Sequence, residues 1–251
     1  MNNWSKEWKG KSLWSNGTSS SRGVACLFKH NLDLDICNSD KDPNGRFVSA
    51  EVKIDDHVYC FISVYAPNAA NERKTFFNNL CTKLCLKKQC NPDLELIIGG
   101  DFNCILNPHL DRRNADGLNA AKPDSGHEEL KNLLNENELE EIWRRRHPKQ
   151  RKYTYFKKHK KSASRIDYCL VSSSVTSSIS KTTIVSAPLT DHAAITLKIN
   201  TIDAERGPGF WKMNIEVLNS ELFENTFKTF WQTWEKSIDK YVDKRQWWEI
   251  T

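Results

Sequence analysis

The sequence predicts an α/β protein with more than one sheet. Its first 67 residues hold a series of short apolar or alternating runs, the pattern of consecutive strands. Similar runs then alternate with two stretches in which apolar residues recur every three to four positions, as in amphipathic helices. With 251 residues, 38% of them hydrophobic, the chain is long enough to bury a full core. Strands first, then strands alternating with helices, favour the α/β class.

The expected elements follow in order along the chain. Four consecutive strands are predicted at 22–30, 32–37, 46–54 and 57–67, and the short turn between the last two favours a hairpin. An amphipathic helix is predicted at 71–88 and a buried strand at 94–100, from helical spacing in the first and a continuous apolar run in the second. A second helix is predicted at 125–143. Four more strands follow, at 152–156, 165–172, 181–188 and 192–199.

After Asp203 the sequence changes in character. A connection marked by Gly and Pro occupies 205–214, and apolar and aromatic residues then recur every three to four positions from Leu218 to Tyr241. This spacing predicts one long amphipathic helix. We therefore expect a domain at 10–203, followed by a linker and helix at 204–251.

Some classes of protein are disfavoured by composition. No apolar run approaches the roughly 20 residues of a membrane helix, and the N-terminus lacks the apolar segment of a secretory signal. We expect no membrane partner, a nuclear or cytoplasmic rather than secreted protein, and eight reduced cysteines. The spacing of Cys81, Cys85 and Cys90 is compatible with zinc. We interpret it instead as one helix face and its end, because no partnered CxxC motif or histidine pair accompanies it.

Positive charge is concentrated in one segment. Residues 144–165 contain eleven Lys or Arg and no acid, although the whole chain has a net charge of only +5. Tyr153, Tyr155 and Phe156 lie between these charges, a combination that suits a polyanion such as nucleic acid. A solvated loop is the alternative. The expected nucleic-acid contacts are Arg144, Arg145, Arg146, Lys157, Lys158, Lys160 and Lys161.

Three polar clusters stand at the ends of apolar runs: 100–103, 164–168 and 190–192. Each alone is a weak signal, because an Asp at the end of a strand most often caps a turn. Their joint occurrence in this order is more specific. With "SVYAPN" (63–68), "IIGGDFN" (97–103), "SRIDYCLVS" (164–172) and "LTDHAAI" (189–195), the chain resembles the exonuclease–endonuclease–phosphatase superfamily, whose fold is like that of deoxyribonuclease I.

Within that superfamily, the chain is most similar to the endonuclease domain of LINE-type (non-LTR) retrotransposon polyproteins. The segments at 15–28, 100–113 and 144–156 resemble that branch, and "GPGFWKMN" (207–214) resembles the segment leading toward the reverse transcriptase. The resemblance implies a four-layer α/β/β/α sandwich with a C-terminal helical tail. It also implies DNA as partner, and a reverse transcriptase domain in a longer polyprotein.

The resemblance also implies Mg²⁺-dependent hydrolysis of phosphodiester bonds, which suits carboxylate and amide oxygens. Asp101 would orient and deprotonate the attacking water, and Asn103 would position that water and the phosphate. His192 would donate a hydrogen bond to a non-bridging phosphate oxygen, and Asp167 would hold its imidazole. The metal environment would include Asp101, Asn103, Asp191 and His192.

Tyr65 would donate a further hydrogen bond near the phosphate. Members of the superfamily also carry an early Asn and a metal-binding Glu, which should precede the strand at 22–30. The single glutamate there, Glu7, does not match the motif. We therefore expect a chain that begins inside the domain, lacks its first strands and is catalytically impaired.

The alternatives are a complete enzyme with a replacement ligand, a non-catalytic nucleic-acid-binding remnant, and a superfamily phosphatase acting on small sugar phosphates. The basic aromatic segment and the tail disfavour the phosphatase.

Overall fold

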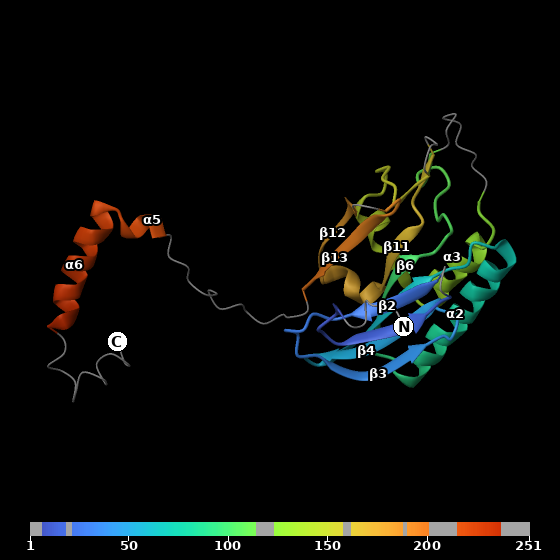
Figure 1. The fold of residues 1–251 in the computed structure, drawn as a ribbon, viewed down its shortest axis with the longest axis horizontal. Helices are drawn as coiled ribbons and strands as arrows, with labels where there is room; N and C mark the ends of the chain where they lie inside the picture. Colours follow the sequence, from blue (N-terminus) through green and yellow to red (C-terminus); the bar gives the residue numbers. More distant parts are fainter. Residues whose placement is uncertain are drawn as a thin grey trace. The chain divides into compact units, whose positions relative to one another are not determined.

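The computed structural model describes residues 7–18, 22–113, 123–157, 162–187, 190–200 and 215–236. The chain divides into two compact units, Met1–Asp203 and Ala204–Thr251. The sheets and the helices that cover them belong to the first unit (Figure 1). In the second unit, the described residues form helices α5 (Ile215–Leu218) and α6 (Glu221–Glu235). The assignment of the first unit as an endonuclease-like domain, and of the second as a linker and helix, stays a prediction.

The main sheet of the first unit has six strands in the order β3-β4-β5-β6-β11-β8. Their bounds are β3 (Asp35–Lys41), β4 (Phe47–Ile54), β5 (His57–Tyr65), β6 (Glu95–Asp101), β8 (Leu139–Glu141) and β11 (Asp167–Ser172). Strands β5 and β6 are parallel, and the other neighbours are antiparallel. A parallel pair needs a crossover, and helix α2 (Ala70–Cys90) supplies it.

Two helices cover one face of this sheet (Figure 1). Helix α2 and helix α3 (His127–Glu136) place Phe77, Leu84 and Leu133 in one buried cluster with Ile62 and Ile98 of the sheet. All five side chains are almost fully buried. This cluster fixes the central strands β5 and β6, whose ends carry the site described below.

Paired strands cover the opposite face. Strands β12 (Ile179–Ser186) and β13 (Ala193–Ile199) pack Ile195 and Leu197 against Ile97 and Val171 of the main sheet. Strands β1 (Ser12–Asn16) and β2 (Gly23–Leu27) pair with each other and contact β4 and β5. The α/β class is confirmed. On the outer face of β13, Ala194, Thr196 and Lys198 are exposed.

The expected helix at 125–143 is wrong in its second half. The chain forms α3, then strand β8, then the short helix α4 (Ile142–Arg146). Two local features end α3: the side chain of Asn137 donates to the carbonyl of Leu133 at 3.1 Å, and Glu138 has a positive φ of 52°. The carboxylate of Glu141 then accepts from two backbone N–H groups and starts α4.

Other boundaries also differ from expectation. Strand β1 was not predicted, and the strand expected at 152–156 shrinks to β9 (Tyr155–Phe156), which joins β10 (Ala163–Ser164) and β7 (Arg112–Arg113) in a small sheet. The long C-terminal helix is interrupted at Ser220, whose hydroxyl accepts from the Phe223 N–H and starts α6. Residues 237–241 of that prediction lie outside the described residues. No helix in the described part of the chain is long and apolar enough to span a membrane.

Candidate active site

Strand β6 carries the first site residue at its carboxyl end. Gly100 adopts φ +147°, and a Cβ there would lie 2.0 Å from the carbonyl oxygen of Val64 on β5. Only glycine fits this close approach of the two strands. The parallel register then places Asp101 beside Tyr65 on β5. The glycine therefore allows the close approach of β5 and β6 that places Asp101 beside Tyr65.

Asn103 holds the Asp101 carboxylate in place. Its backbone N–H donates to Asp101 Oδ1 at 2.8 Å, in a tight turn where Asn103 has φ 47°. Asparagine tolerates this left-handed conformation better than most residues. Its side-chain Nδ2 donates to the carbonyl oxygen of Ala66 at 2.9 Å. The amide of Asn103 is thereby fixed next to the carboxylate.

Strand β11 brings in the second carboxylate, and the segment before β13 brings in the imidazole. Asp167 lies directly opposite Asp101 in the antiparallel register of β6 and β11. His192 Nδ1 donates to Asp167 Oδ2 at 2.9 Å. One ligand atom from each of Asp101, Asp167 and His192 lies within 4.8 Å of the other two. Residues that are 91 positions apart in sequence thus form one compact polar group.

The electrostatics of this group differ from those of free side chains. Burial, followed by the negative charge of Asp167, raises the pKa of Asp101 to about 6. The hydrogen bond from His192 to Asp167 raises the pKa of the imidazole, and the charges of Asp167, Asp101 and Asp191 add to this effect. Asp101 is therefore a better proton acceptor than a free aspartate, and the cationic form of His192 is favoured more than in a free imidazole.

Thr154 is a site residue that the sequence did not reveal. It is fully buried, and its hydroxyl oxygen accepts from the backbone N–H groups of Ile166 and Asp167, both at 3.1 Å. Its carbonyl oxygen accepts from the Ala193 N–H at 2.6 Å. Thr154 therefore ties the segment before β11 to the segment after His192. Its only signal in sequence was a polar residue between two aromatics.

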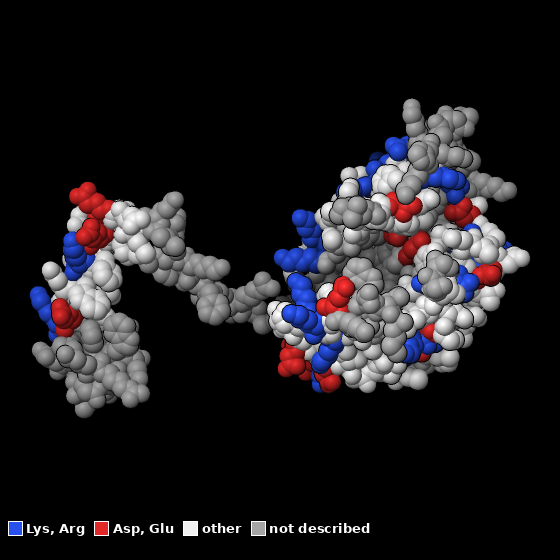
Figure 2. Space-filling model, in the orientation of Figure 1, with Lys and Arg blue, Asp and Glu red and all other residues white. Residues whose placement is uncertain are grey.

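Tyr65 and Asp191 lie near the group without joining it. The guanidinium of Arg46 lies 5.1 Å from the centre of the Tyr65 ring and donates to the Tyr65 carbonyl oxygen at 3.2 Å. Asp191 precedes His192, and its carbonyl oxygen accepts from the Phe156 N–H. Figure 2 shows Asp and Glu side chains inside a hollow of the first unit, with Lys and Arg side chains at its outer edges.

The basic segment is less available to a polyanion than its composition suggests. Arg165 is fully buried, and its guanidinium forms two bonds of 3.0 Å to Asp111 and one of 2.6 Å to Glu141. Arg144 also binds Asp111 and donates to two backbone carbonyls. These partners could not be predicted from the basic segment itself, because Asp111 and Glu141 lie outside it.

The remaining predicted contacts differ in exposure. Arg145 forms an exposed ion pair with Glu140, and Arg146 donates to the carbonyl oxygens of Ile179 and Ser180. Lys157 is exposed. Lys158, Lys160 and Lys161 lie outside the described residues. Arg144 and Arg146 are thus held by protein groups, whereas Lys149, Arg151, Lys152 and Lys157 are exposed.

The polar group fits a hard divalent cation. Two carboxylates lie opposite each other, and their mutual repulsion contributes to the raised pKa of Asp101. A cation between them would remove that repulsion, and carboxylate oxygens are the ligands that Mg²⁺ prefers. The described residues offer no glutamate to the group.

The helix-covered sheet, the paired strands and the polar group at the strand ends define a deoxyribonuclease-I-like fold. The 3′-5′ exonuclease NExo of Neisseria meningitidis superposes with a TM-score of 0.59 at 21% identity, covering 76% of this chain and 79% of that one. The 3′ phosphatase NExo from Neisseria, bound to a product DNA hairpin, superposes with a TM-score of 0.61 at 20% sequence identity. The superposition covers 79% of this chain and 83% of that one. An AP endonuclease from Archaeoglobus fulgidus superposes with a TM-score of 0.56 at 17% sequence identity, covering 75% of this chain and 79% of that one.

A family model described as endonuclease-reverse transcriptase matches residues 59–196, more than half of the 251 residues. The chain belongs to this family, and the resemblance expected from its motifs is confirmed. The transposon TX1 uncharacterized 149 kDa protein of Xenopus laevis is 29% identical over 249 residues. That alignment covers 98% of this chain and 18% of the frog protein, so the chain spans about a fifth of the relative's length.

Proposed function

We propose that the chain hydrolyses phosphodiester bonds in DNA, as a Mg²⁺-dependent endonuclease that nicks one strand. The observation that carries this proposal is the group of Asp101, Asp167 and His192, with ligand atoms within 4.8 Å of one another at the ends of β6, β11 and the segment before β13. Two carboxylates and one imidazole supply a base, a hydrogen-bond donor and oxygen ligands for a cation.

Asp101 is the base in this proposal. In the metal-free protein, burial followed by the charge of Asp167 raises the pKa of Asp101 to about 6, which makes this carboxylate a better proton acceptor than a free aspartate. The N–H of Asn103 holds one carboxylate oxygen, so the other is available to the attacking water. Asn103 therefore orients the base and, through its amide, lines the position of the phosphate.

His192 is the donor to the phosphate. Its Nδ1 is committed to Asp167, which leaves Nε2 free to donate to a non-bridging oxygen. The raised pKa of His192 favours the cation, which stabilises the extra negative charge of the transition state. Tyr65, next to Asp101 in register, would donate a second hydrogen bond.

The residues proposed to form the metal environment are Asp101, Asn103, Asp191 and His192. Of these, Asp101 and His192 offer ligand atoms in the compact group with Asp167. When bound, Mg²⁺ neutralises phosphate charge at this position. We propose that the rate is low, because the described group contains no glutamate. Loss of a single electrostatic stabiliser costs other enzymes about 10²–10³-fold in rate.

DNA contact is proposed for Lys157, Lys158, Lys160 and Lys161, with Arg145 at the edge. A polyprotein context, with a reverse transcriptase elsewhere in it, is supported by the family match and by the much longer frog relative. Because its proposed substrate is DNA, we place the protein in the nucleus or cytoplasm.

The test is conversion of supercoiled plasmid to the nicked form. We expect slow nicking with Mg²⁺ and none with EDTA. DNA binding without nicking at any Mg²⁺ concentration would favour the second candidate, a non-catalytic nucleic-acid-binding protein, which the exposed part of the basic segment supports. Nicking that persists in EDTA would contradict the metal-dependent proposal.

A further inference from the structure

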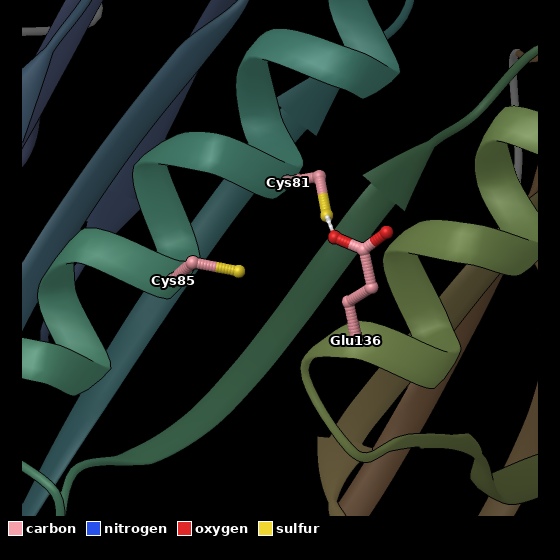
Figure 3. Close-up of side chains that lie close together, drawn as sticks. All are labelled: Cys81, Cys85 and Glu136. Atoms are coloured by element: carbon pink, nitrogen blue, oxygen red, sulfur yellow. Dashed lines mark hydrogen bonds between the residues drawn. The ribbon is translucent and has the colours of Figure 1, made fainter.

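A second cluster of metal-ligating side chains lies between the two helices that cover the sheet. Cys81 and Cys85 are four positions apart on α2 and project from the same face, toward Glu136 at the end of α3 (Figure 3). Cys81 Sγ lies 3.1 Å from Glu136 Oε2. One ligand atom from each of the three residues lies within 4.8 Å of the other two.

The surroundings of the cluster orient both sulfur atoms. Asn137 is fully buried, and its side-chain Nδ2 donates to Cys81 Sγ at 3.4 Å. The Cys85 thiol donates to Asn137 Oδ1 at 3.6 Å. Cys81 is buried, Cys85 is half-buried and Glu136 is exposed, so the cluster has one side open to solvent. An ion can therefore reach ligands that the protein already holds together.

We propose that Cys81, Cys85 and Glu136 bind a thiophilic divalent cation, Zn²⁺. With Zn–S near 2.3 Å and Zn–O near 2.0–2.2 Å, a tetrahedral site separates its ligand atoms by roughly 3.5–3.8 Å. The observed separations, from 3.1 Å up to at most 4.8 Å, bracket that range. Small movements of the three side chains would bring the ligand atoms to that spacing, with water as the fourth ligand.

Binding exchanges protons for the metal. In the metal-free protein the Cys81 thiol donates to Glu136. Zn²⁺ would replace the two thiol protons, which pass to solvent, and would bond to two thiolates and one carboxylate oxygen. Since the ligands come from α2 and α3, the ion would link the two helices that cover β5 and β6. The spacing of the cysteines alone did not indicate this site, because the third ligand lies 55 positions from Cys81.

Cobalt is the probe that separates this cluster from the group around Asp101. Thiolate ligands give Co²⁺ an intense sulfur-to-metal charge-transfer band, which carboxylate and imidazole ligands do not. The full chain, freed of metal and kept reduced, is titrated with Co²⁺ and then with Zn²⁺. We expect one equivalent to develop the band, and Zn²⁺ to remove it by displacing Co²⁺.

The variants make the assignment specific. Cys81→Ser and Cys85→Ser should each reduce the band. Loss even of an outer partner of a bound metal costs about 10–100-fold in affinity, so Glu136→Gln should weaken Zn²⁺ binding by at least about tenfold. Because the Glu136 side chain is exposed, we expect the Glu136→Gln variant to fold as the parent chain does. The matched control is Cys90→Ser, an exposed cysteine on the same helix outside the cluster, which should bind as the parent chain does.

Asp101→Asn should also leave the charge-transfer band unchanged. Absence of the band in the folded, reduced parent chain would overturn the proposal. So would an undiminished band in the Cys81→Ser/Cys85→Ser double variant, or Zn²⁺ binding by Glu136→Gln that equals that of Cys90→Ser.

Discussion

Asp101 and Asp167 lie directly opposite each other across the antiparallel strands β6 and β11. Like charges in this position destabilise a sheet, and here the site is also partly desolvated. Burial, followed by the negative charge of Asp167, raises the pKa of Asp101 to about 6. A pair of carboxylates held in this way is costly for the fold and useful to a cation, which is the physical basis of the proposed function.

The first prediction concerns stability. Because the folded-state pKa of Asp101 exceeds its ordinary value of 3.8, ionisation opposes folding; the penalty is full above about pH 6 and absent below about pH 4. Asp101→Asn should therefore stabilise the metal-free protein at pH 7.5, by at most about 3 kcal/mol, and not at pH 4. Urea unfolding in EDTA at both pH values measures this.

The control for that experiment is Asp33→Asn, which removes an exposed carboxylate from a loop. It should change stability little at either pH. A destabilised Asp101→Asn protein at pH 7.5 would show that the two facing carboxylates do not oppose each other as described.

The second prediction concerns the charge of His192. Its hydrogen bond to Asp167 is the largest cause of its raised pKa, so Asp167→Asn should lower the pKa of His192 toward its ordinary value of 6.5. Histidine resonances followed by NMR across a pH titration give this directly. Asp33→Asn, which removes an exposed loop carboxylate, is the control and should leave the His192 titration as it is in the parent chain. An unchanged His192 titration would show that the hydrogen bond to Asp167 does not raise the pKa of the imidazole.

The third prediction concerns Thr154. Thr154→Val keeps the shape of the side chain but removes the acceptor for two buried N–H groups, which should cost about 1–3 kcal/mol. Because one of those groups belongs to Asp167, nicking should fall as well. Thr154→Ser keeps the hydroxyl and should retain most of the activity. Equal activity in the Val and Ser variants would show that the Thr154 hydroxyl does not support the active site.

The fourth prediction concerns the buried arginine. Arg165→Met removes the guanidinium partner of the buried Glu141 and leaves the buried Asp111 with Arg144 alone, which should destabilise the protein by about 3–5 kcal/mol. Arg145→Met breaks the exposed pair with Glu140 and should cost about 0–1 kcal/mol. Thermal or urea unfolding compares the two. Similar losses in both would mean that burial does not distinguish these ion pairs.

The fifth prediction concerns DNA affinity and salt. If Lys157, Lys158, Lys160 and Lys161 contact four phosphates of duplex DNA, the log–log slope of affinity against salt includes about −3.6 from them, at about −0.9 per contact. Replacing all four with Ala should flatten the slope by that amount in an anisotropy titration. Lys41→Ala/Lys53→Ala, on exposed positions of β3 and β4, is the control. An unchanged slope would identify the segment as a solvated loop.

The main strands and the acid at the end of β6 could be predicted from local sequence, because apolar runs that end in Gly and Asp can be recognised without knowledge of tertiary contacts. Strand β8 could not be predicted from local sequence, because its pairing with β11 depends on tertiary structure. Arg165 looked like its basic neighbours, and only three-dimensional packing buries it against Asp111. The grouping of Asp101 with His192 was expected from resemblance, because no local pattern reports a contact over 91 positions.

The most direct test of the account is the nicking rate of Asp101→Asn relative to the parent chain, measured on supercoiled plasmid in Mg²⁺ with both proteins purified in parallel. We predict slow, EDTA-sensitive nicking by the parent and a loss of at least about 10²-fold in the variant, the usual cost of removing such a catalytic group. Equal nicking by the two folded proteins would contradict the claim that Asp101 is the centre of a hydrolytic site.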